Sequence, residues 1–291
     1  MPNRSSLIDL QSMLFPLYSN CILKPYADYK FSNEKELFKG KNISKSNRQS
    51  ICLFTTHKCA STFFARLLKL FENVSDYKNI NFEGYMYLKQ LNKKEIFVDE
   101  AFLNDCFKTK GYIYGPLRTY IEIPDIEEYK VVLILRDPRD VMVSHYFSMA
   151  YSHKMINKDF FKLRKNALSK TIDELVFEIS DYYYETYKNY STLLNNKNMM
   201  FVSYDHIISS PAQFLNKILD FTCIDLNEDQ KNNILMNELN YSSQKSMTEK
   251  FNHHRRSGKS GDYKNKLKPE TIDLLNQKFE EIIKVYGFTF D

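Results

Sequence analysis

The sequence predicts an α/β fold: a single domain whose central parallel β-sheet is flanked by helices. Three short apolar runs, at residues 50–55, 130–136 and 199–204, are each followed by a stretch in which apolar residues recur at helical spacing. Strands that alternate with helices in this way indicate a parallel sheet with helices on both sides. The second run contains five consecutive aliphatic residues, which is typical of a strand covered on both faces.

The first run leads through a tight turn into a helix that begins near Thr62. Its apolar residues recur at the spacing of one buried helix face: Phe63, Phe64, Leu67, Leu68 and Phe71. After the second run, Asp137 and Pro138 are the N-cap and first-turn residues of a helix that we expect to reach about Tyr151. The third run continues into a helix through Phe214, Ile218 and Leu219. The pattern predicts four further elements: a strand at 112–114, a tyrosine-rich helix at 172–194, a basic loop at 252–268 and a terminal helix from Pro269.

Composition limits the class of protein. The chain has 291 residues, 43% of them hydrophobic, and only 7 glycines and 8 prolines, so no linker divides it. A net charge of +5 is too small to indicate a nucleic-acid partner, but it suits a ligand with several phosphates. The five cysteines are scattered without a CxxC spacing, so we expect no disulfide framework, no metal site and a reducing cytoplasm. We find no apolar segment long enough for a signal peptide or a membrane span, and expect no membrane partner.

The turn after the first predicted strand has the residues of an anion-binding site. A helix N-terminus presents unsatisfied N–H groups and the positive end of a dipole. Lys58 adds a cation, and Ser61 and Thr62 add hydroxyl donors. Taken alone, these residues also fit an ordinary capped helix with a surface lysine. The turn does not match the motif of a nucleoside-triphosphatase P-loop, because no glycine occurs between Ser50 and Gly84, and this argues strongly against a P-loop kinase.

A second anion-binding segment begins where the second predicted strand ends. Arg136 lies at the edge where ligands gather in open α/β sheets, and Ser144 follows about two helical turns later. We expect Asp137 to cap the helix and Arg139 to pair with Asp140. An ordinary capped helix explains the Asp-Pro step, but not an arginine that closes a buried strand.

The third segment is the basic loop at residues 253–265. Gly258 and Gly261 allow close approach of the backbone to an anion, and Arg256 can bind a phosphate through two parallel hydrogen bonds. The alternative is a solvated charged loop.

Together, the three segments resemble the PAPS-dependent sulfotransferase family over about residues 50–290, where PAPS is 3′-phosphoadenosine 5′-phosphosulfate. Residues 57–63 are similar to the family's 5′-phosphosulfate loop, Tyr-Pro-Lys-Ser-Gly-Thr-Thr-Trp. Residues 136–144 are similar to its 3′-phosphate motif, and residues 256–265 to its C-terminal loop, Arg-Lys-Gly-x-x-Gly-Asp-Trp-Lys. Tyr204 resembles the family's tyrosine that contacts adenine.

The resemblance implies a P-loop-like sulfotransferase architecture, with the main domain at residues 50–291 and an N-terminal extension at residues 1–49 that packs on or lines the acceptor side. It implies transfer of the PAPS sulfuryl group to a hydroxyl or amine of a small-molecule acceptor, such as a secondary metabolite. The product would be adenosine 3′,5′-bisphosphate (PAP), no metal would be required, and the enzyme would be a cytoplasmic monomer or homodimer. The implied donor-binding residues are Lys58, Cys59, Ala60, Ser61, Thr62, Phe63, Arg136, Ser144, Tyr204, Arg256, Ser257 and Gly258.

The sequence does not identify the catalytic base. The family's Lys-x-His-Leu-Pro motif should precede the second predicted strand, but residues 112–118 contain neither lysine nor histidine. We expect Lys58 to stabilise charge on the departing phosphate and His57 to be either the base or a packing residue. The weaker base candidates are Glu83, Asp99, Glu100 and His145.

On the acceptor side the candidates are Arg118, which could instead form a surface salt bridge, and Glu83. In the C-terminal loop, Ser257 replaces the family's lysine, which predicts that one phosphate contact is weaker or lies elsewhere. Two other classes remain. One is a sulfotransferase-like nucleotide-binding protein without turnover, and the other is a P-loop kinase that depends on ATP and Mg²⁺.

Overall fold

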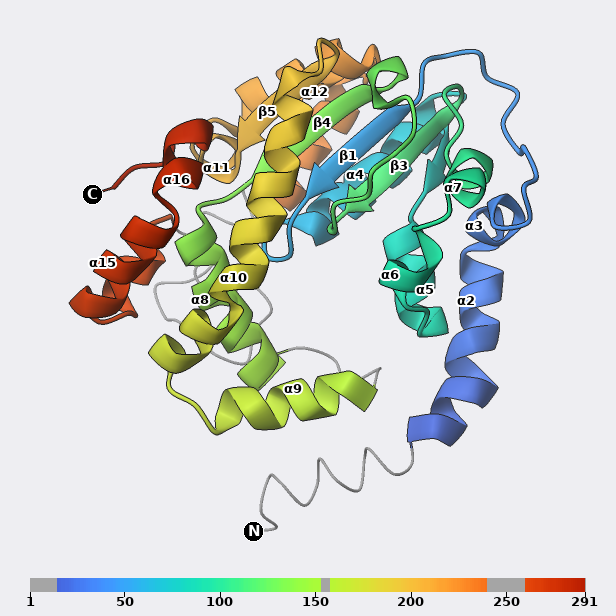
Figure 1. Cartoon of the computed structure of the whole chain (residues 1–291). Helices are drawn as coiled ribbons and strands as arrows, with labels where there is room; N and C mark the ends of the chain where they lie inside the picture. The colour runs from blue at the N-terminus through green and yellow to red at the C-terminus, as the bar shows by residue number, and fades with distance from the viewer. Residues whose placement is uncertain (1–14, 153–157, 240–259, 291) are drawn as a thin grey trace.

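A computed structural model describes residues 15–152, 158–239 and 260–290 of the chain (Figure 1). Its centre is a sheet of five parallel strands in the order β2-β3-β1-β4-β5, with β1 in the middle. The strands span Ile51–Thr55 (β1), Lys78–Ile80 (β2), Tyr112–Leu117 (β3), Lys130–Leu135 (β4) and Met199–Ser203 (β5). The predicted parallel α/β fold is confirmed. The three-residue strand β2 was not predicted, because a run that short carries no periodic signal.

Helices cover both faces of the sheet because alternate strand residues point to opposite sides. Ile51 and Leu53 of β1 pack in one apolar cluster with α4 and α12, whereas Cys52 and Phe54 pack in another with α5, α10 and α16. In Figure 1, α10 crosses in front of the sheet and α4 and α12 lie behind it. The helices that flank the sheet span Ser61–Val74 (α4), Phe82–Lys89 (α5), Glu100–Cys106 (α7), Pro138–Phe147 (α8), Ile172–Ser191 (α10), Tyr204–Ser209 (α11), Pro211–Thr222 (α12), Pro269–Lys278 (α15) and Glu280–Tyr286 (α16).

Local signals in the sequence fix where several of these helices begin. The Asp137 carboxylate accepts a hydrogen bond from the N–H of Arg139 and Pro138 follows it, so the predicted cap of α8 is confirmed. A π-helical turn, Ser148–Ser152, extends α8 to the length expected. Thr171 and Glu174 form a reciprocal capping box at the start of α10.

Residues 15–49 pack beside α5. This part of the chain contains α2 (Lys24–Lys30) and α3 (Ser32–Leu37), and its aromatic rings contact those of α5. The ring centroids of Phe38 and Phe82 lie 5.2 Å apart. The carboxylate of Glu34, only 4% exposed, accepts a hydrogen bond of 2.7 Å from the backbone N–H of Asn81, which caps α5. A domain boundary at residue 49 stays a prediction.

The remaining helices are peripheral: Lys93–Ile96 (α6), Lys158–Leu168 (α9) and Glu228–Asn233 (α13). Within the described ranges, none of the helices combines the length and apolar character that crossing a bilayer requires.

Candidate functional site

The loop between β1 and α4 brings Lys58 to the carboxyl edge of the sheet. Two non-glycine residues there have left-handed backbone angles, Lys58 with φ of 69° and Ala60 with φ of 57°. This conformation turns the chain sharply into α4, whose first turn closes when the N–H of Phe63 donates to the Ala60 carbonyl at 2.8 Å. Because glycine adopts such angles without strain, alanine at position 60 stores a cost of about 1 kcal/mol.

Cys59 anchors this loop to the protein interior. Its side chain is fully buried, and its Sγ lies 2.9 Å from the Thr56 hydroxyl. Burial raises the pKa of the Cys59 thiol, so the sulfur is a packing and hydrogen-bonding group at neutral pH. Lys58, Ala60 and Ser61 on either side are partly exposed and Thr62 is exposed, so the loop presents its backbone and its lysine outward.

Arg136 is held at the end of β4, the strand next to β1. It is 5% exposed, its guanidinium lies 3.3 Å from the Asp140 carboxylate, and the guanidinium carbon lies 4.9 Å from the ring centre of Tyr204. Burial is the largest single influence on the pKa of Arg136 and lowers it, but the Asp140 carboxylate together with Tyr204, Cys59 and Asp205 outweighs burial, and the pKa of the arginine is raised. A permanent cation therefore stands one strand away from the Lys58 loop.

The predicted pairing of Arg139 with Asp140 was wrong. Arg139 instead bonds to Asp137, with its Nε 2.9 Å from Oδ1, and the carbon of its guanidinium lies 4.3 Å from the ring centre of Tyr263. Asp140, in the first turn of α8, instead lies 3.3 Å from Arg136 at the end of β4.

Asp140 also holds the C-terminal loop against Arg136. Its two carboxylate oxygens accept hydrogen bonds from the N–H groups of Gly261 at 2.8 Å and Tyr263 at 3.0 Å. The Ser260 hydroxyl donates to Asp205, the neighbour of Tyr204. The chain that follows the predicted phosphate-binding residues thus emerges beside Arg136. Those residues themselves, Arg256, Ser257 and Gly258, lie outside the described part of the chain.

Three tyrosines of α10 contact the same edge, at positions i, i+4 and i+7 of one helix face. The hydroxyl of Tyr190 donates to the Thr55 carbonyl at the end of β1, at 2.6 Å. The hydroxyl of Tyr187 donates to the Arg136 carbonyl, and that of Tyr183 lies 2.7 Å from Nδ1 of His145. The sequence showed a tyrosine-rich helix, but its period alone did not tell strand-end contacts from core packing.

Two more of the residues predicted to bind the donor, Ser144 and Phe63, lie in helices. Ser144 lies in α8, partly exposed, two turns beyond Arg136, and Phe63 is buried in α4 with its ring centroid 4.9 Å from that of Phe64. Phe63 thus packs in the apolar cluster that β1 forms with α4 and α12, rather than at the edge of the sheet.

The base candidates lie in different environments. His57 is partly exposed in the loop, beside Lys58, whereas the His145 ring is bonded to the buried Tyr183. The Asp99 carboxylate accepts from the N–H of Ala101 and caps α7, and Glu100 begins that helix. Where the family histidine was expected, Tyr114 is fully buried and its hydroxyl accepts from the N–H of Lys108 at 2.7 Å.

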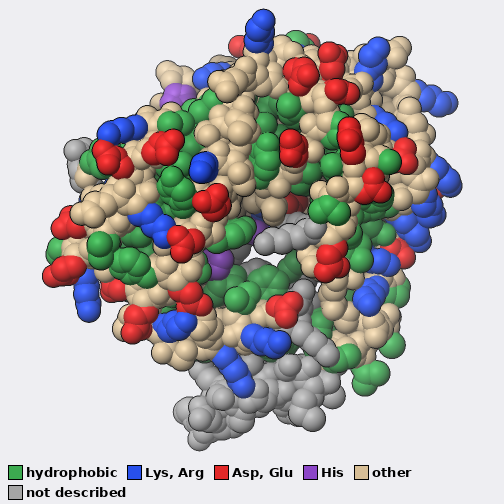
Figure 2. All heavy atoms as spheres, viewed as in Figure 1, with side chains coloured by type: hydrophobic (Ala, Val, Ile, Leu, Met, Phe, Trp, Pro, Cys, Tyr) green, Lys and Arg blue, Asp and Glu red, His purple; other side chains and the backbone are tan. Residues whose placement is uncertain are grey.

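The two residues predicted for the acceptor side, Glu83 and Arg118, are joined through the backbone of Arg118. The Glu83 carboxylate, 3% exposed, accepts from the N–H of Arg118 at 3.1 Å and of Thr119 at 3.2 Å. Figure 2 shows a hollow on this face below the sheet, between α8 and α10 on one side and α5 on the other, with histidine and hydrophobic side chains on its walls.

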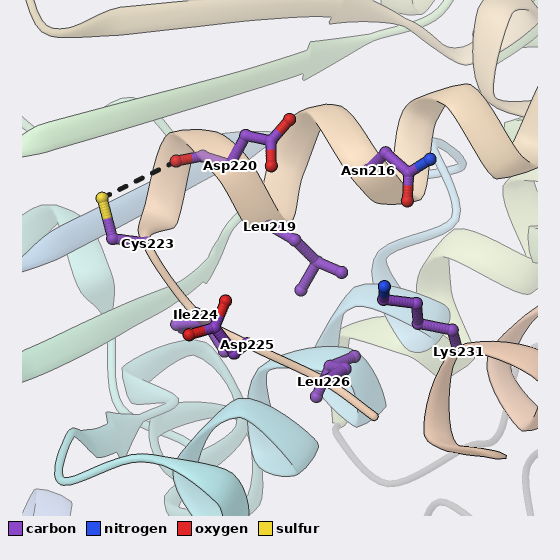
Figure 3. Close-up of a pocket in the computed structure, with 8 residues that line it drawn as sticks. All are labelled: Asn216, Leu219, Asp220, Cys223, Ile224, Asp225, Leu226 and Lys231. Atoms are coloured by element: carbon purple, nitrogen blue, oxygen red, sulfur yellow. Dashed lines mark hydrogen bonds between the residues drawn. The ribbon is translucent and has the colours of Figure 1, made fainter. Parts of the chain in front are cut away.

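A second hollow lies away from this edge, along α12 (Figure 3). Its lining contains none of the predicted site residues; it consists of Asn216, Leu219, Asp220, Cys223, Ile224, Asp225, Leu226 and Lys231. In the described ranges no group of three or more histidine, cysteine, aspartate and glutamate side chains is placed to hold a metal ion.

Comparisons with known proteins identify a family that matches the sequence and solved structures that share the fold. A protein-family model described as "Sulfotransferase domain" matches residues 48–287. Among solved structures, the chain resembles a mouse sulfotransferase, SULT7A1, complexed with PAP, with a TM-score of 0.55, 17% identity, and coverage of 86% of this chain and 89% of that one. It also resembles a retinol dehydratase in complex with androsterone and inactive cofactor PAP, with a TM-score of 0.51, 16% identity and 86% coverage of each chain. A search of curated protein sequences found no match.

Proposed function

This chain belongs to the sulfotransferase family, and on that premise we propose that it transfers the sulfuryl group of PAPS to a hydroxyl or amine of a small-molecule acceptor. One observation carries the donor assignment. Thr55 of β1 lies beside Ile134 of β4, so the Lys58 loop and Arg136 extend from adjacent strand ends. Two cations and a helix N-terminus at one edge suit a nucleotide that is phosphorylated at both its 5′ and 3′ positions.

In this proposal the loop binds the 5′-phosphosulfate and Arg136, Ser144 and the C-terminal loop bind the 3′-phosphate. The Tyr204 ring, already packed on Arg136, contacts the adenine. Both structural relatives were solved with PAP, which supports the same donor here.

The reaction needs in-line attack and stabilisation of charge on the leaving group. The acceptor oxygen or nitrogen forms a bond to sulfur while the bond between sulfur and the 5′-phosphate oxygen breaks, which yields PAP. Lys58 and the first N–H groups of α4 stabilise the charge that develops on that phosphate. We propose that the reaction requires no metal ion for this role. We propose His57 as the group that receives the acceptor proton, because it adjoins Lys58 in the loop.

Two further properties belong to the proposal. All five cysteines are free thiols, which suits the cytoplasm. We propose residues 1–49 as an extension on the acceptor side, since residues 15–49 pack on α5, next to the hollow of Figure 2. We expect the enzyme to act as a monomer or homodimer without a nucleic-acid or membrane partner.

The decisive experiment is transfer of ³⁵S from PAPS to a panel of phenols, alcohols and amines, with sulfate addition read by mass spectrometry. In parallel, PAP at about 100 times its Kd should stabilise the fold by about 2.7 kcal/mol, and ATP with Mg²⁺ by less. Arg136→Gln should abolish the PAP effect. Binding of PAP without transfer to any acceptor would instead favour a protein without turnover, and a preference for ATP with Mg²⁺ would favour a kinase.

A further inference from the structure

The guanidinium of Arg118 has no polar partner in the described parts of the chain. Arg118 is partly buried, its Nε is shielded from solvent, and that nitrogen has no hydrogen-bond acceptor. The hydrogen bond that the residue does make is donated by its backbone N–H. Because buried donors in proteins are almost always satisfied, a shielded Nε–H without an acceptor indicates that a ligand supplies one.

Arg118 lies one strand from the Lys58 loop. It is the first residue after β3, and Leu117, the last residue of that strand, lies beside Phe54 of β1. The Tyr190 hydroxyl donates to the carbonyl of Thr55 at 2.6 Å and is 3.4 Å from the carbonyl of Leu117, so it holds the two strand ends together. An anion bound at Arg118 would therefore lie at the same edge as the transferred group.

The neighbouring carboxylate of Glu83 forms no ion pair with this arginine. Glu83 directs its Oε1 at the backbone N–H groups of Arg118 and Thr119, which fixes the main chain. The phenol of Tyr87, also in α5, is neutral at physiological pH and adds no negative charge near Arg118. Burial raises its pKa to about 12, although the charge of Arg118 opposes that rise.

We propose that Arg118 binds an anionic group of the acceptor, so that the preferred substrates are small hydroxy or amino compounds that carry a carboxylate. A planar guanidinium matches a carboxylate through two parallel hydrogen bonds. The proposal rests on the proposed transferase function. The same chemistry could serve the sulfuryl oxygens of the donor, and the experiment distinguishes these two sources.

The test compares matched acceptors with and without the charge: 3-hydroxybenzoate against its methyl ester, and 4-hydroxyphenylacetate against its methyl ester. For the wild type, kcat/KM should favour each acid by at least about tenfold. Arg118→Gln should remove that preference through a higher KM for the acids, with little change for the esters or for the KM of PAPS. Arg118→Lys should restore part of the preference, since it returns the charge but not the paired geometry.

Lys188→Gln is the control for net charge. It removes one positive charge at an exposed position of α10 and should leave every ratio unchanged. Equal kcat/KM for acids and esters in the wild type would overturn the proposal. So would an equal fall for both in Arg118→Gln, which would assign the arginine to the sulfuryl group of the donor.

A binding measurement separates this inference from the proposed function. In the presence of PAP, 3-hydroxybenzoate should raise the melting temperature of the wild type and of Lys188→Gln but not of Arg118→Gln. If the wild type transfers nothing, the transferase proposal fails and this measurement still decides the role of Arg118. Equal shifts in all three proteins, or no shift in the wild type, would contradict it.

Discussion

The hydroxyl of Tyr187, near the C-terminal end of α10, donates a hydrogen bond to the main-chain carbonyl of Arg136. One turn later, Tyr190 makes the equivalent bond to the carbonyl of Thr55. The two carbonyls belong to the residues from which the Arg136 segment and the Lys58 loop depart. The distance between the two proposed phosphate-binding sites is thus set by one helix as well as by the sheet.

Removal of the Tyr187 hydroxyl should weaken both the fold and the nucleotide site. In Tyr187→Phe the buried carbonyl of Arg136 loses its donor, which should cost about 1–2 kcal/mol of unfolding free energy and reduce the affinity for PAP. Urea unfolding and calorimetric titration with PAP measure the two effects. Tyr184→Phe is the matched control, since the hydroxyl of Tyr184 makes a 3.4 Å contact with Glu281 at the surface. Equal losses in both variants would show that the Arg136 contact has no special role.

Replacement of Ala60 by glycine should stabilise the protein. Ala60 holds a φ of 57°, which glycine adopts without steric cost. We expect Ala60→Gly to gain about 0.5–1 kcal/mol after the greater entropy of the unfolded chain is counted. Thermal unfolding measures the change. Ala65→Gly, inside α4, should lose about 1 kcal/mol, so the two substitutions should shift the melting temperature in opposite directions. A loss in both would mean that the loop is not strained at residue 60.

Glu34 should make the fold less stable at alkaline pH. Burial raises its pKa from 4.5 to about 7, with Glu72 adding to the rise and Lys69 and the Asn81 N–H opposing it. The folded protein therefore holds this proton more tightly than the unfolded chain does. The resulting stabilisation, at most about 3 kcal/mol, is complete below the unfolded pKa and is lost as pH rises through about 7.

Urea midpoints measured from pH 5 to pH 8 test this dependence. Glu34→Gln keeps an oxygen that can accept from the Asn81 N–H, so we expect its midpoint to change less with pH and to exceed that of the wild type at pH 8. Glu36→Gln is the control, because its partly exposed carboxylate, with a pKa lowered to about 2 by Lys39 and Lys41, is ionised throughout that range. An unchanged pH dependence in Glu34→Gln would exclude Glu34 as its source.

Lys58→Ala should lower the rate of sulfuryl transfer by at least about 10²-fold, by analogy with the loss of one donor to a developing anion. Single-turnover transfer from PAPS measures the chemical step, and circular dichroism checks that the fold is kept. The exposed Lys188→Ala should retain the wild-type rate. A rate near that of the wild type in Lys58→Ala would remove this lysine from the mechanism.

The sequence contained enough to predict the parallel sheet and the start of α8, because apolar runs and the Asp137-Pro138 step are local signals. Contacts between distant segments were beyond it. The bond from Gly261 to Asp140 spans 121 residues, and nothing near either residue indicates the other. The mistaken partner of Arg139 has the same origin, since helical geometry and the position of Tyr263 decide which carboxylate it meets. Residues 256–258 stay a prediction.

The three tyrosines of α10 also affect which parts of the fold can open locally. Thr55, Arg136 and His145 are each bonded to one helix, so none of them can separate from it without breaking a buried or partly buried hydrogen bond. Regions of this kind open only in large cooperative units, and their amide hydrogens exchange slowly with solvent. Entry and departure of a nucleotide would then depend on movement of segments outside this unit. The sheet edge and α10 would keep the same hydrogen bonds from one turnover to the next.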